Sequence, residues 1–230
     1  MRVAALVSGG KDSALALHRT LQEGHEVKFL VAMIPQREDS WMFHYPNIHL
    51  VDLFAEAANI PLMKGCTAGV KEEEVEDLKV VLAGLDVEGV VSGAVASQYQ
   101  RQRILKVCKE LGLQSIAPLW GEDPLKLLKE LVNQKFKAII TGVYAYGFDK
   151  SWLGRQINVD TISALLELNR KYHISLIGEG GEYETLVLDA PFFRKKIDII
   201  ETEIVWENQT GWLQVKKAQL KAKKQDTFSH

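Results

Sequence analysis

The chain of 230 residues is 47% hydrophobic and 25% charged, which excludes wholesale disorder and low-complexity structure. Its 28 Lys and Arg residues against 30 Asp and Glu residues give a net charge of −2, so nucleic acid is not expected as a partner bound through bulk charge. The two cysteines, Cys66 and Cys108, cannot form a disulfide framework or a four-cysteine zinc site. No apolar run could span a membrane and no signal-peptide pattern opens the chain, so we expect a cytoplasmic protein.

The first half of the chain alternates apolar runs with amphipathic segments. The run at Arg2–Ser8 is continuously apolar in its middle, as in a parallel strand that is covered on both faces. The elements predicted after it are a helix at Asp12–Glu23, a strand at Val27–Ile34, a connection at Gln36–Pro46, a helix at Asn47–Asn59, a strand at Pro61–Cys66, a helix at Lys71–Leu85, a strand at Gly89–Val95, a helix at Ser97–Leu111, a strand at Ile116–Trp120 and a helix that starts at Asp123. This alternation implies parallel crossovers, so we expect an α/β fold with a doubly wound, mostly parallel sheet.

The alternation stops after about residue 136. The elements predicted there are a strand at Ala138–Val143, a helix near Thr161–Tyr172, a glycine- and acid-rich loop at Gly178–Glu184, and strands at Ile197–Trp206 and Trp212–Leu220 around a turn at residues 208–211. We therefore expect a main domain over residues 1–135 and a smaller C-terminal α+β lobe over residues 136–230.

A phosphate-binding loop is predicted between the first strand and the first helix, at Ser8-Gly9-Gly10-Lys11-Asp12-Ser13. The two glycines permit a tight turn and let backbone N–H groups approach an anion, and the helix that follows adds the positive end of its dipole. The two serines add hydroxyl donors and the lysine adds a compact positive charge. The spacing is neither that of Walker A nor Gly-x-Gly-x-x-Gly, and a serine-capped glycine turn without a ligand is the alternative interpretation.

This loop resembles that of the ATP pyrophosphatases with the adenine nucleotide α-hydrolase-like (HUP-type) fold, also called the PP-loop superfamily. The resemblance implies that ATP is cleaved between its α and β phosphates, with the loop holding the departing pyrophosphate. It also implies that Asp12 helps to organise Mg²⁺, a cation that the charge of pyrophosphate requires.

Further motifs narrow the resemblance to one family. They are Asp39-Ser40-Trp41-Met42-Phe43-His44, Glu74–Leu78, Gly93–Arg103, Trp152-Leu153-Gly154-Arg155, Gly178–Thr185 and Leu188-Asp189-Ala190-Pro191. In this order, with the phosphate loop, they resemble the diphthine–ammonia ligase family in its compact archaeal form, from residue 1 to about residue 205. The resemblance implies an AMP-forming ligase that makes a carbon–nitrogen bond.

The site residues predicted on this basis fall into three overlapping sets. The ATP-binding set is Ser8, Gly9, Gly10, Lys11, Asp12, Ser13, Gly93, Tyr99, Gln100, Arg101 and Arg103, and Asp12 is the metal ligand. The substrate-binding set is His44, Trp152, Gly154, Arg155, Glu179, Gly180, Gly181, Glu182, Glu184 and Thr185. The catalytic set is Lys11, Asp12, Arg101, Arg103, Glu182 and Glu184.

Each motif beyond the phosphate loop has a functional interpretation with a physical reason and an alternative, structural interpretation. Two arginines at the start of a helix after the fourth strand could clamp phosphate oxygens, or they form a solvated basic helix start. The acidic loop repels bare phosphate and suits a cation or ammonium, or it is a charged hairpin loop. Trp152 and Arg155 could wall a substrate, or they are a structural Trp and a surface Arg. Buried thiols explain both cysteines better than catalysis does.

The function expected from the resemblance is adenylation of the carboxylate of diphthine on translation elongation factor 2, followed by attack of ammonia, giving diphthamide, AMP and pyrophosphate. The expected ligands are ATP, Mg²⁺ and free ammonium, because no glutaminase nucleophile is evident. Two other functions stay open: adenylation of another acceptor such as a tRNA base, and a non-catalytic ATP-binding sensor. A homodimer also stays open.

Overall fold

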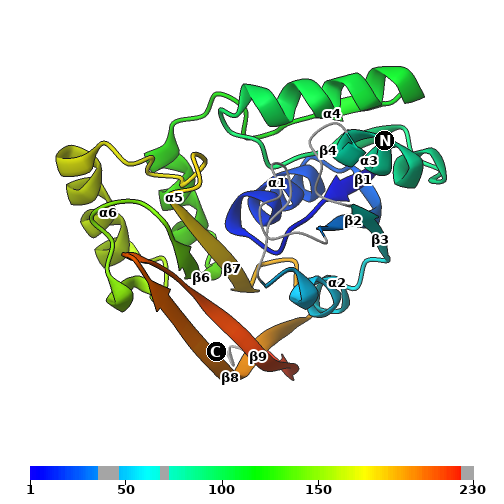
Figure 1. Cartoon of the computed structure of the whole chain (residues 1–230). Coiled ribbons are helices and arrows are strands. Elements are labelled where there is room, and N and C mark those ends of the chain that lie inside the picture. The colour runs from blue at the N-terminus through cyan, green and yellow to red at the C-terminus, as the bar shows by residue number, and fades with distance from the viewer. Residues whose placement is uncertain (36–46, 68–72, 224–230) are drawn as a thin grey trace, which may run out of the picture.

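The computed structural model describes residues 1–35, 47–67 and 73–223. Its elements, shown in Figure 1, are β1 (Arg2–Leu6), α1 (Lys11–Gln22), β2 (Glu26–Pro35), the 3₁₀ helix η1 (Asn47–Leu50), α2 (Val51–Ala58), β3 (Leu62–Thr67), α3 (Glu73–Ala83), β4 (Gly89–Val91), α4 (Gln98–Leu111), β5 (Gln114–Ile116), α5 (Pro124–Asn133), β6 (Lys137–Val143), the 3₁₀ helix η2 (Lys150–Trp152), α6 (Val159–Tyr172), β7 (Tyr183–Asp189), β8 (Lys195–Glu207) and β9 (Thr210–Ala222).

The N-terminal sheet has five parallel strands in the order β3-β2-β1-β4-β5. The chain runs outward from β1 to β3 and then returns to place β4 on the other side of β1. The prediction of a doubly wound parallel sheet is confirmed. In such sheets ligands bind outside the carboxyl ends of the strands, where the strand order reverses, which here is between β1 and β4.

Successive residues of the central strands point to opposite faces of the sheet. In β1, Val3 and Ala5 belong to an apolar cluster with residues of α1 and α2, whereas Ala4 belongs to a second cluster with residues of α3 and α4. In β2, Leu30 belongs to the first cluster and Val31 to the second. Because both faces are covered, these strands read as continuous apolar runs rather than as alternating ones.

Two predicted helix starts are confirmed in atomic detail. The Ser97 hydroxyl accepts a hydrogen bond of 3.3 Å from the backbone N–H of Gln100, and Asp123 accepts one of 2.8 Å from the backbone N–H of Lys126. Each cap satisfies a backbone donor that the helix itself leaves without a partner.

The predictions for two short strands need correction. The apolar segment after Ile116 is a turn rather than a strand, in which the Trp120 N–H donates to the Ala117 carbonyl at 3.1 Å. The fourth strand ends at Val91 rather than at Val95, because the N–H of Val95 donates to a glutamate side chain instead of a neighbouring strand. Apolar composition alone does not distinguish a strand from a buried turn.

The second sheet is antiparallel, with the order β7-β6-β9-β8. Its long β8–β9 hairpin turns over Asn208 and Gln209, which have φ values of +48° and +67°. This two-residue turn is shorter than the predicted one and suits the twist of the strands. The first half of β6 pairs with residues 154–157 instead of β9, since the N–H of Ile140 donates to the Arg155 carbonyl at 2.9 Å.

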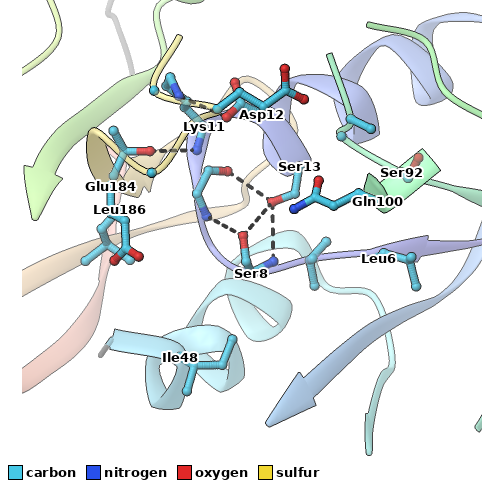
Figure 2. A pocket seen from close by; sticks show the side chains of 18 of the residues that line it. Leu6, Ser8, Lys11, Asp12, Ser13, Ile48, Ser92, Gln100, Glu184 and Leu186 are labelled. Carbon is cyan, nitrogen blue, oxygen red and sulfur yellow. Dashed lines mark hydrogen bonds and ion pairs between the residues drawn. The ribbon is translucent and has the colours of Figure 1, made fainter. Parts of the chain in front are cut away.

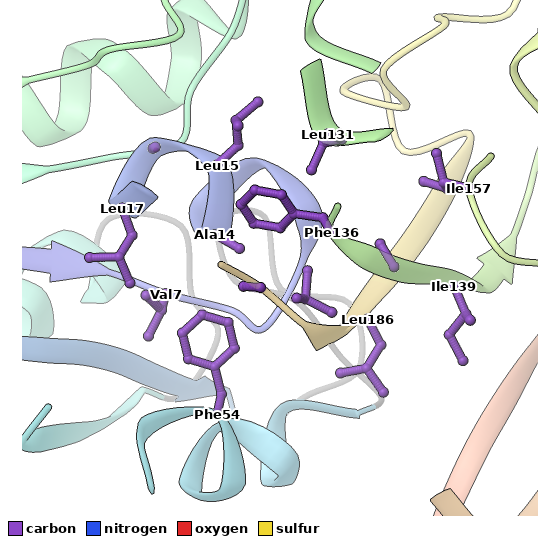
Figure 3. Close-up of a cluster of buried hydrophobic side chains, with 14 of the residues drawn as sticks. Val7, Ala14, Leu15, Leu17, Phe54, Leu131, Phe136, Ile139, Ile157 and Leu186 are labelled. Atoms are coloured by element: carbon purple, nitrogen blue, oxygen red, sulfur yellow. The ribbon is translucent and has the colours of Figure 1, made fainter. Parts of the chain in front are cut away.

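The two sheets share one hydrophobic core. Figure 3 shows side chains from both halves in the same cluster, among them Leu15 of α1, Phe54 of α2 and Leu186 of β7. Strand β7 also bonds to the phosphate loop through the Val187 N–H and the Gly9 carbonyl, at 2.8 Å. The packing of the two halves is therefore continuous. The division into a main domain over residues 1–135 and a C-terminal lobe over residues 136–230 stays a prediction.

The two thiols have different environments. Cys108 of α4 is buried, and burial raises the pKa of its thiol to about 11. Cys66 is exposed, which corrects the prediction that both are buried. It lies on β3, an edge strand of the parallel sheet.

Among the described residues, no helix has the length and apolar character that a bilayer crossing needs.

Candidate functional site

A cavity of about 560 Å³ opens where β1 and β4 end, at the point where the strand order reverses. Figure 2 shows the phosphate loop at its centre, with Ser92 and Gln100 on one side of the loop and Glu184 and Leu186 on the other. Seven of the predicted ATP-binding residues line it: Ser8, Gly10, Lys11, Asp12, Ser13, Gly93 and Gln100.

The phosphate loop is held by its own side chains. The Ser13 hydroxyl accepts from the Ser8 N–H at 3.3 Å and donates to the Gly10 carbonyl at 3.1 Å. Gly9 has a φ of +82°, a conformation that favours glycine. Gly93, after β4, lies so close to the loop that a Cβ there would be 2.7 Å from the backbone nitrogen of Ser13. These contacts and the close approach of Gly93 fix the shape of the turn.

Lys11 is 2% exposed, and its ammonium group lies between the two lobes. It donates to the Asp12 carboxylate at 2.9 Å and to the Ile177 carbonyl, and it lies 5.0 Å from the ring centroid of Tyr183. Burial, and then the negative charges of Asp12 and Glu182, raise the pKa of Tyr183 well above its usual value. Lys11 thus lines the cavity while tying α1 to the C-terminal lobe.

Asp12 uses one carboxylate oxygen on Lys11. Its other oxygen, Oδ1, is buried and makes no hydrogen bond within the part of the chain that the structure describes. An oxygen in this position is suited to bind a cation, because burying a carboxylate oxygen without a partner costs free energy that a bound cation would offset. Among the described residues, no group of three or more His, Cys, Asp or Glu side chains is placed so that it could hold a metal ion.

Strand β7 forms the wall behind the loop. The hydroxyl of Thr185 accepts a hydrogen bond of 3.1 Å from the backbone N–H of Lys11. Thr185, Glu184, Gly180, Gly181 and Glu179 are the predicted substrate-binding residues that line the cavity. The predicted loop at Gly178–Glu184 is too long by two residues, since β7 begins at Tyr183 and Glu184 is a strand residue.

Two other acidic side chains bind backbone groups. The Glu179 carboxylate accepts from the N–H groups of Val95, at 2.7 Å, and Ala96, at 2.5 Å, and so joins the acidic loop to the segment after β4. Glu182 accepts from the Ser175 N–H at 2.9 Å and does not line the cavity. These contacts stabilise the walls of the site.

The predicted arginine clamp lies on aromatic rings. The guanidinium of Arg101 is 4.4 Å from the ring centroid of Trp120, and that of Arg103 is 3.5 Å from the centroid of Tyr99. These two arginines, Tyr99 and Gly9 are not among the lining residues of the cavity. In the structure, the first turn of α4 contributes Gln100 to it.

The Trp152–Arg155 motif lies away from the cavity. Trp152 is buried edge-on against Phe148, with ring centroids 5.0 Å apart. Gly154 donates its N–H to Ile140 at 2.8 Å, and the Arg155 Nε donates to the Thr161 hydroxyl at 3.1 Å. The motif thus pairs alongside β6 through its backbone, and its arginine contacts the first turn of α6. His44 lies outside the described residues.

The sequence interpretation missed the apolar part of the cavity wall. This wall comprises Leu6, Val31, Met33, Ile48 and Ile104, from β1, β2, η1 and α4. For the three strand residues the sequence offers position as a signal, since the carboxyl ends of parallel strands face the ligand crevice, whereas Ile48 and Ile104 lie on helices. A flat apolar ligand group could bind against this wall while anionic groups bind at the loop.

Comparison with known proteins identifies the family of this chain. The family model described as the diphthamide synthase N-terminal domain matches residues 1–115, and that of the C-terminal domain matches residues 123–221. The diphthine–ammonia ligase of Mus musculus is 39% identical over 238 residues, covering 94% of this chain and 89% of the mouse protein. That of Homo sapiens is 38% identical, covering 89% of this chain and 85% of the human protein.

More distant similarities also exist. The diphthine–ammonia ligase of Saccharomyces cerevisiae is 33% identical over 87% of this chain and 35% of the yeast protein. A solved structure described as a predicted subunit of tRNA methyltransferase from Methanocaldococcus jannaschii is 16% identical, with a TM-score of 0.45, covering 83% of this chain and 97% of that one. On the two domain matches and the extent of the curated similarities, this chain belongs to the diphthamide synthase family, that of the diphthine–ammonia ligases.

Proposed function

We propose that the protein is an AMP-forming amide ligase that converts the diphthine of translation elongation factor 2 to diphthamide. The carboxylate of diphthine attacks the α-phosphorus of ATP, pyrophosphate leaves, and ammonia then displaces AMP from the acyl-adenylate. Activation is needed because a carboxylate is a poor electrophile, whereas AMP is a good leaving group. The observation that supports this most directly is the cavity that joins the phosphate loop to the acidic wall of β7.

The phosphate loop suits the first half-reaction. Backbone N–H groups at the start of α1, the hydroxyls of Ser8 and Ser13, and the buried ammonium of Lys11 surround the anion site. Donors that are in place before the reaction stabilise the charge that develops on pyrophosphate without a cost of reorganisation. The apolar wall beyond the loop suits the adenine base.

Asp12 fits the role of a magnesium ligand. Asp12 lines the same cavity, and its buried Oδ1 lacks a hydrogen-bond partner among the described residues. When bound, Mg²⁺ would neutralise charge on the phosphate oxygens, with Asp12 as its ligand from this chain. The carboxylate also orients Lys11, whose ammonium group it contacts.

The test is an assay with purified protein, ATP, Mg²⁺, ammonium and elongation factor 2 that carries diphthine. We expect the mass of the factor to fall by about one unit, as OH is replaced by NH₂, together with release of one AMP per amide. Because the acceptor is a translation factor, the reaction is expected in the cytoplasm. Formation of ADP in place of AMP would overturn the proposal.

The same assay separates the two other functions. If a tRNA acceptor, and not the factor, stimulated AMP release with a steep dependence on salt, a nucleic-acid substrate would replace the protein one. If ATP bound without turnover in the presence of every acceptor, the protein would be a sensor. Neither alternative is favoured by the family to which the chain belongs.

A further inference from the structure

Helix α1 starts at a residue that cannot cap it. Gly10 is the N-cap residue of α1 and has no side chain that could bond to the first N–H groups of the helix. Serine or aspartate is the usual N-cap residue, but a Cβ on residue 10 would lie only 3.3 Å from the Ser8 hydroxyl oxygen. The glycine suits a backbone that an anion approaches closely, and it leaves α1 without a cap of its own.

Thr185 of the C-terminal lobe supplies this cap. Its hydroxyl oxygen accepts the hydrogen bond of 3.1 Å from the Lys11 N–H, which is the first donor of α1 and has no acceptor within the helix. Two residues further along β7, the Val187 N–H donates to the Gly9 carbonyl at 2.8 Å. Strand β7 therefore holds the phosphate loop on both sides of Gly10.

The strand that carries Thr185 is itself held in place. Thr185 lies opposite Ile140 of β6, and Ile140 is fully buried. The next residue, Leu186, belongs to the apolar cluster that also contains Leu15 of α1. Figure 2 shows Leu186 and Glu184, the two strand neighbours of Thr185, on one side of the phosphate loop. A hydroxyl on a packed strand keeps its position better than one on a loop, so it can fix the geometry of a binding site.

The serines inside the phosphate loop do not replace this contact. The Ser13 hydroxyl bonds to the Ser8 N–H and the Gly10 carbonyl, and the Ser8 hydroxyl accepts from the Gly10 N–H at 3.4 Å. These bonds fix the turn before the helix, whereas Thr185 fixes the first N–H of the helix itself. Donors stabilise a phosphate only when they are aligned beforehand, so the position of this first turn affects ATP rather than the acceptor.

We propose that Thr185 is a positioning residue of the ATP site: it caps α1 from the C-terminal lobe and so holds the phosphate loop in the form that binds the pyrophosphate part of ATP. This role rests on the proposed function, which supplies the nucleotide. It moves Thr185 from the acceptor side of the cavity, where the family resemblance places it, to the nucleotide side. The ATP site is then built from both halves of the chain.

Calorimetric titration with ATP and with AMP tests this role without turnover, in the presence of Mg²⁺ and without acceptor or ammonium. Thr185→Val keeps the shape of the side chain and removes the acceptor oxygen. The dissociation constant of ATP should therefore rise about 10-fold, as expected for the loss of one hydrogen bond. AMP lacks the two phosphates that the loop would hold, so its dissociation constant should change less than about two-fold.

Two further variants separate the hydroxyl from the fold. Thr185→Ser retains the hydroxyl and should bind ATP within about two-fold of the wild type. Thr210→Val removes a hydroxyl that donates to the Glu207 carbonyl at 3.0 Å in the β8–β9 hairpin, and it should leave the affinity for both nucleotides unchanged. If Thr185→Val does not fold, Thr185→Ala lacks the same acceptor oxygen and carries the test.

The amide-forming assay separates failure of this inference from failure of the proposed function. Thr185→Val should raise the KM for ATP and leave the KM for the acceptor unchanged. Unchanged ATP affinity in Thr185→Val and Thr185→Ala, with a wild type that forms the amide, would overturn the inference alone. A raised KM for the acceptor at normal ATP affinity would also overturn it, and would assign Thr185 to the acceptor. A wild type that binds no ATP would overturn the proposed function and the role of Thr185 with it.

Discussion

At the scale of single residues, Lys11 combines two roles that a sequence motif cannot separate. Its side chain is almost fully buried, yet it lines the cavity at the phosphate loop. Lys11→Ala should reduce AMP formation by roughly two to three orders of magnitude, as loss of a transition-state charge does. Steady-state turnover at saturating ATP measures this, with the exposed Lys109→Ala of α4 as the control. A Lys11→Ala enzyme of normal turnover would contradict the assignment of the loop.

His18 of α1 supplies a prediction about pH at the same scale. Burial lowers its pKa from 6.5, against smaller opposing effects from Gln134 and Glu130. The unfolded chain therefore binds a proton at a higher pH than the folded chain does, so folding stability is full above about pH 6.5 and declines as the pH falls below it.

Urea denaturation at pH 7.5 and pH 5.0 measures this decline. In His18→Gln the part of the decline that comes from this residue should be lost, although the variant is less stable at both pH values because His18 packs between Phe136 and Phe192. The exposed His173→Asn, at the end of α6, should keep the wild-type decline. An identical decline in His18→Gln would show that other groups cause it.

At the scale of elements, Glu179 joins the acidic loop of the C-terminal half to the segment between β4 and α4. Glu179→Ala would leave the N–H groups of Val95 and Ala96 without their acceptor. We expect a loss of about 1 kcal/mol in the free energy of unfolding, because the Val95 donor is buried whereas Ala96 is exposed and can bond to water instead. Glu179→Gln retains one acceptor oxygen and should lose less. Equal stability of both variants and the wild type would mean that water replaces the carboxylate.

At the scale of the whole molecule, one hydrophobic cluster crosses both sheets, and β7 bonds to the phosphate loop. A fragment of residues 1–135 should therefore fail to unfold cooperatively, since it exposes the apolar face of α1 that β7 covers and that of α2 that β8 covers. Circular dichroism during thermal unfolding measures this, with the full chain as the reference. A fragment with a sharp transition and bound ATP would instead support two independent domains.

How far the sequence predicts this protein depends on the range of the interactions involved. Alternating apolar runs, the Ser97 and Asp123 caps and the glycine loop are local patterns, and each is confirmed as an element or a turn. The short strands β4 and β5 differ from the prediction in length or position because their ends are set by long-range hydrogen bonds, such as that from the Val95 N–H to Glu179.

Residue periodicity and spacing within a short stretch of chain predict the parallel sheet and the phosphate loop, and the motifs along the chain carry the resemblance to the family. Which charged residues enter the cavity depends on contacts between distant segments, and these contacts exist only in the folded chain. Arg101 and Arg103 lie on aromatic rings, Glu182 binds backbone and does not line the cavity, and Glu179 and Glu184 line it. Composition cannot distinguish these fates, since a charged side chain takes the partners that folding brings within a few ångströms of it.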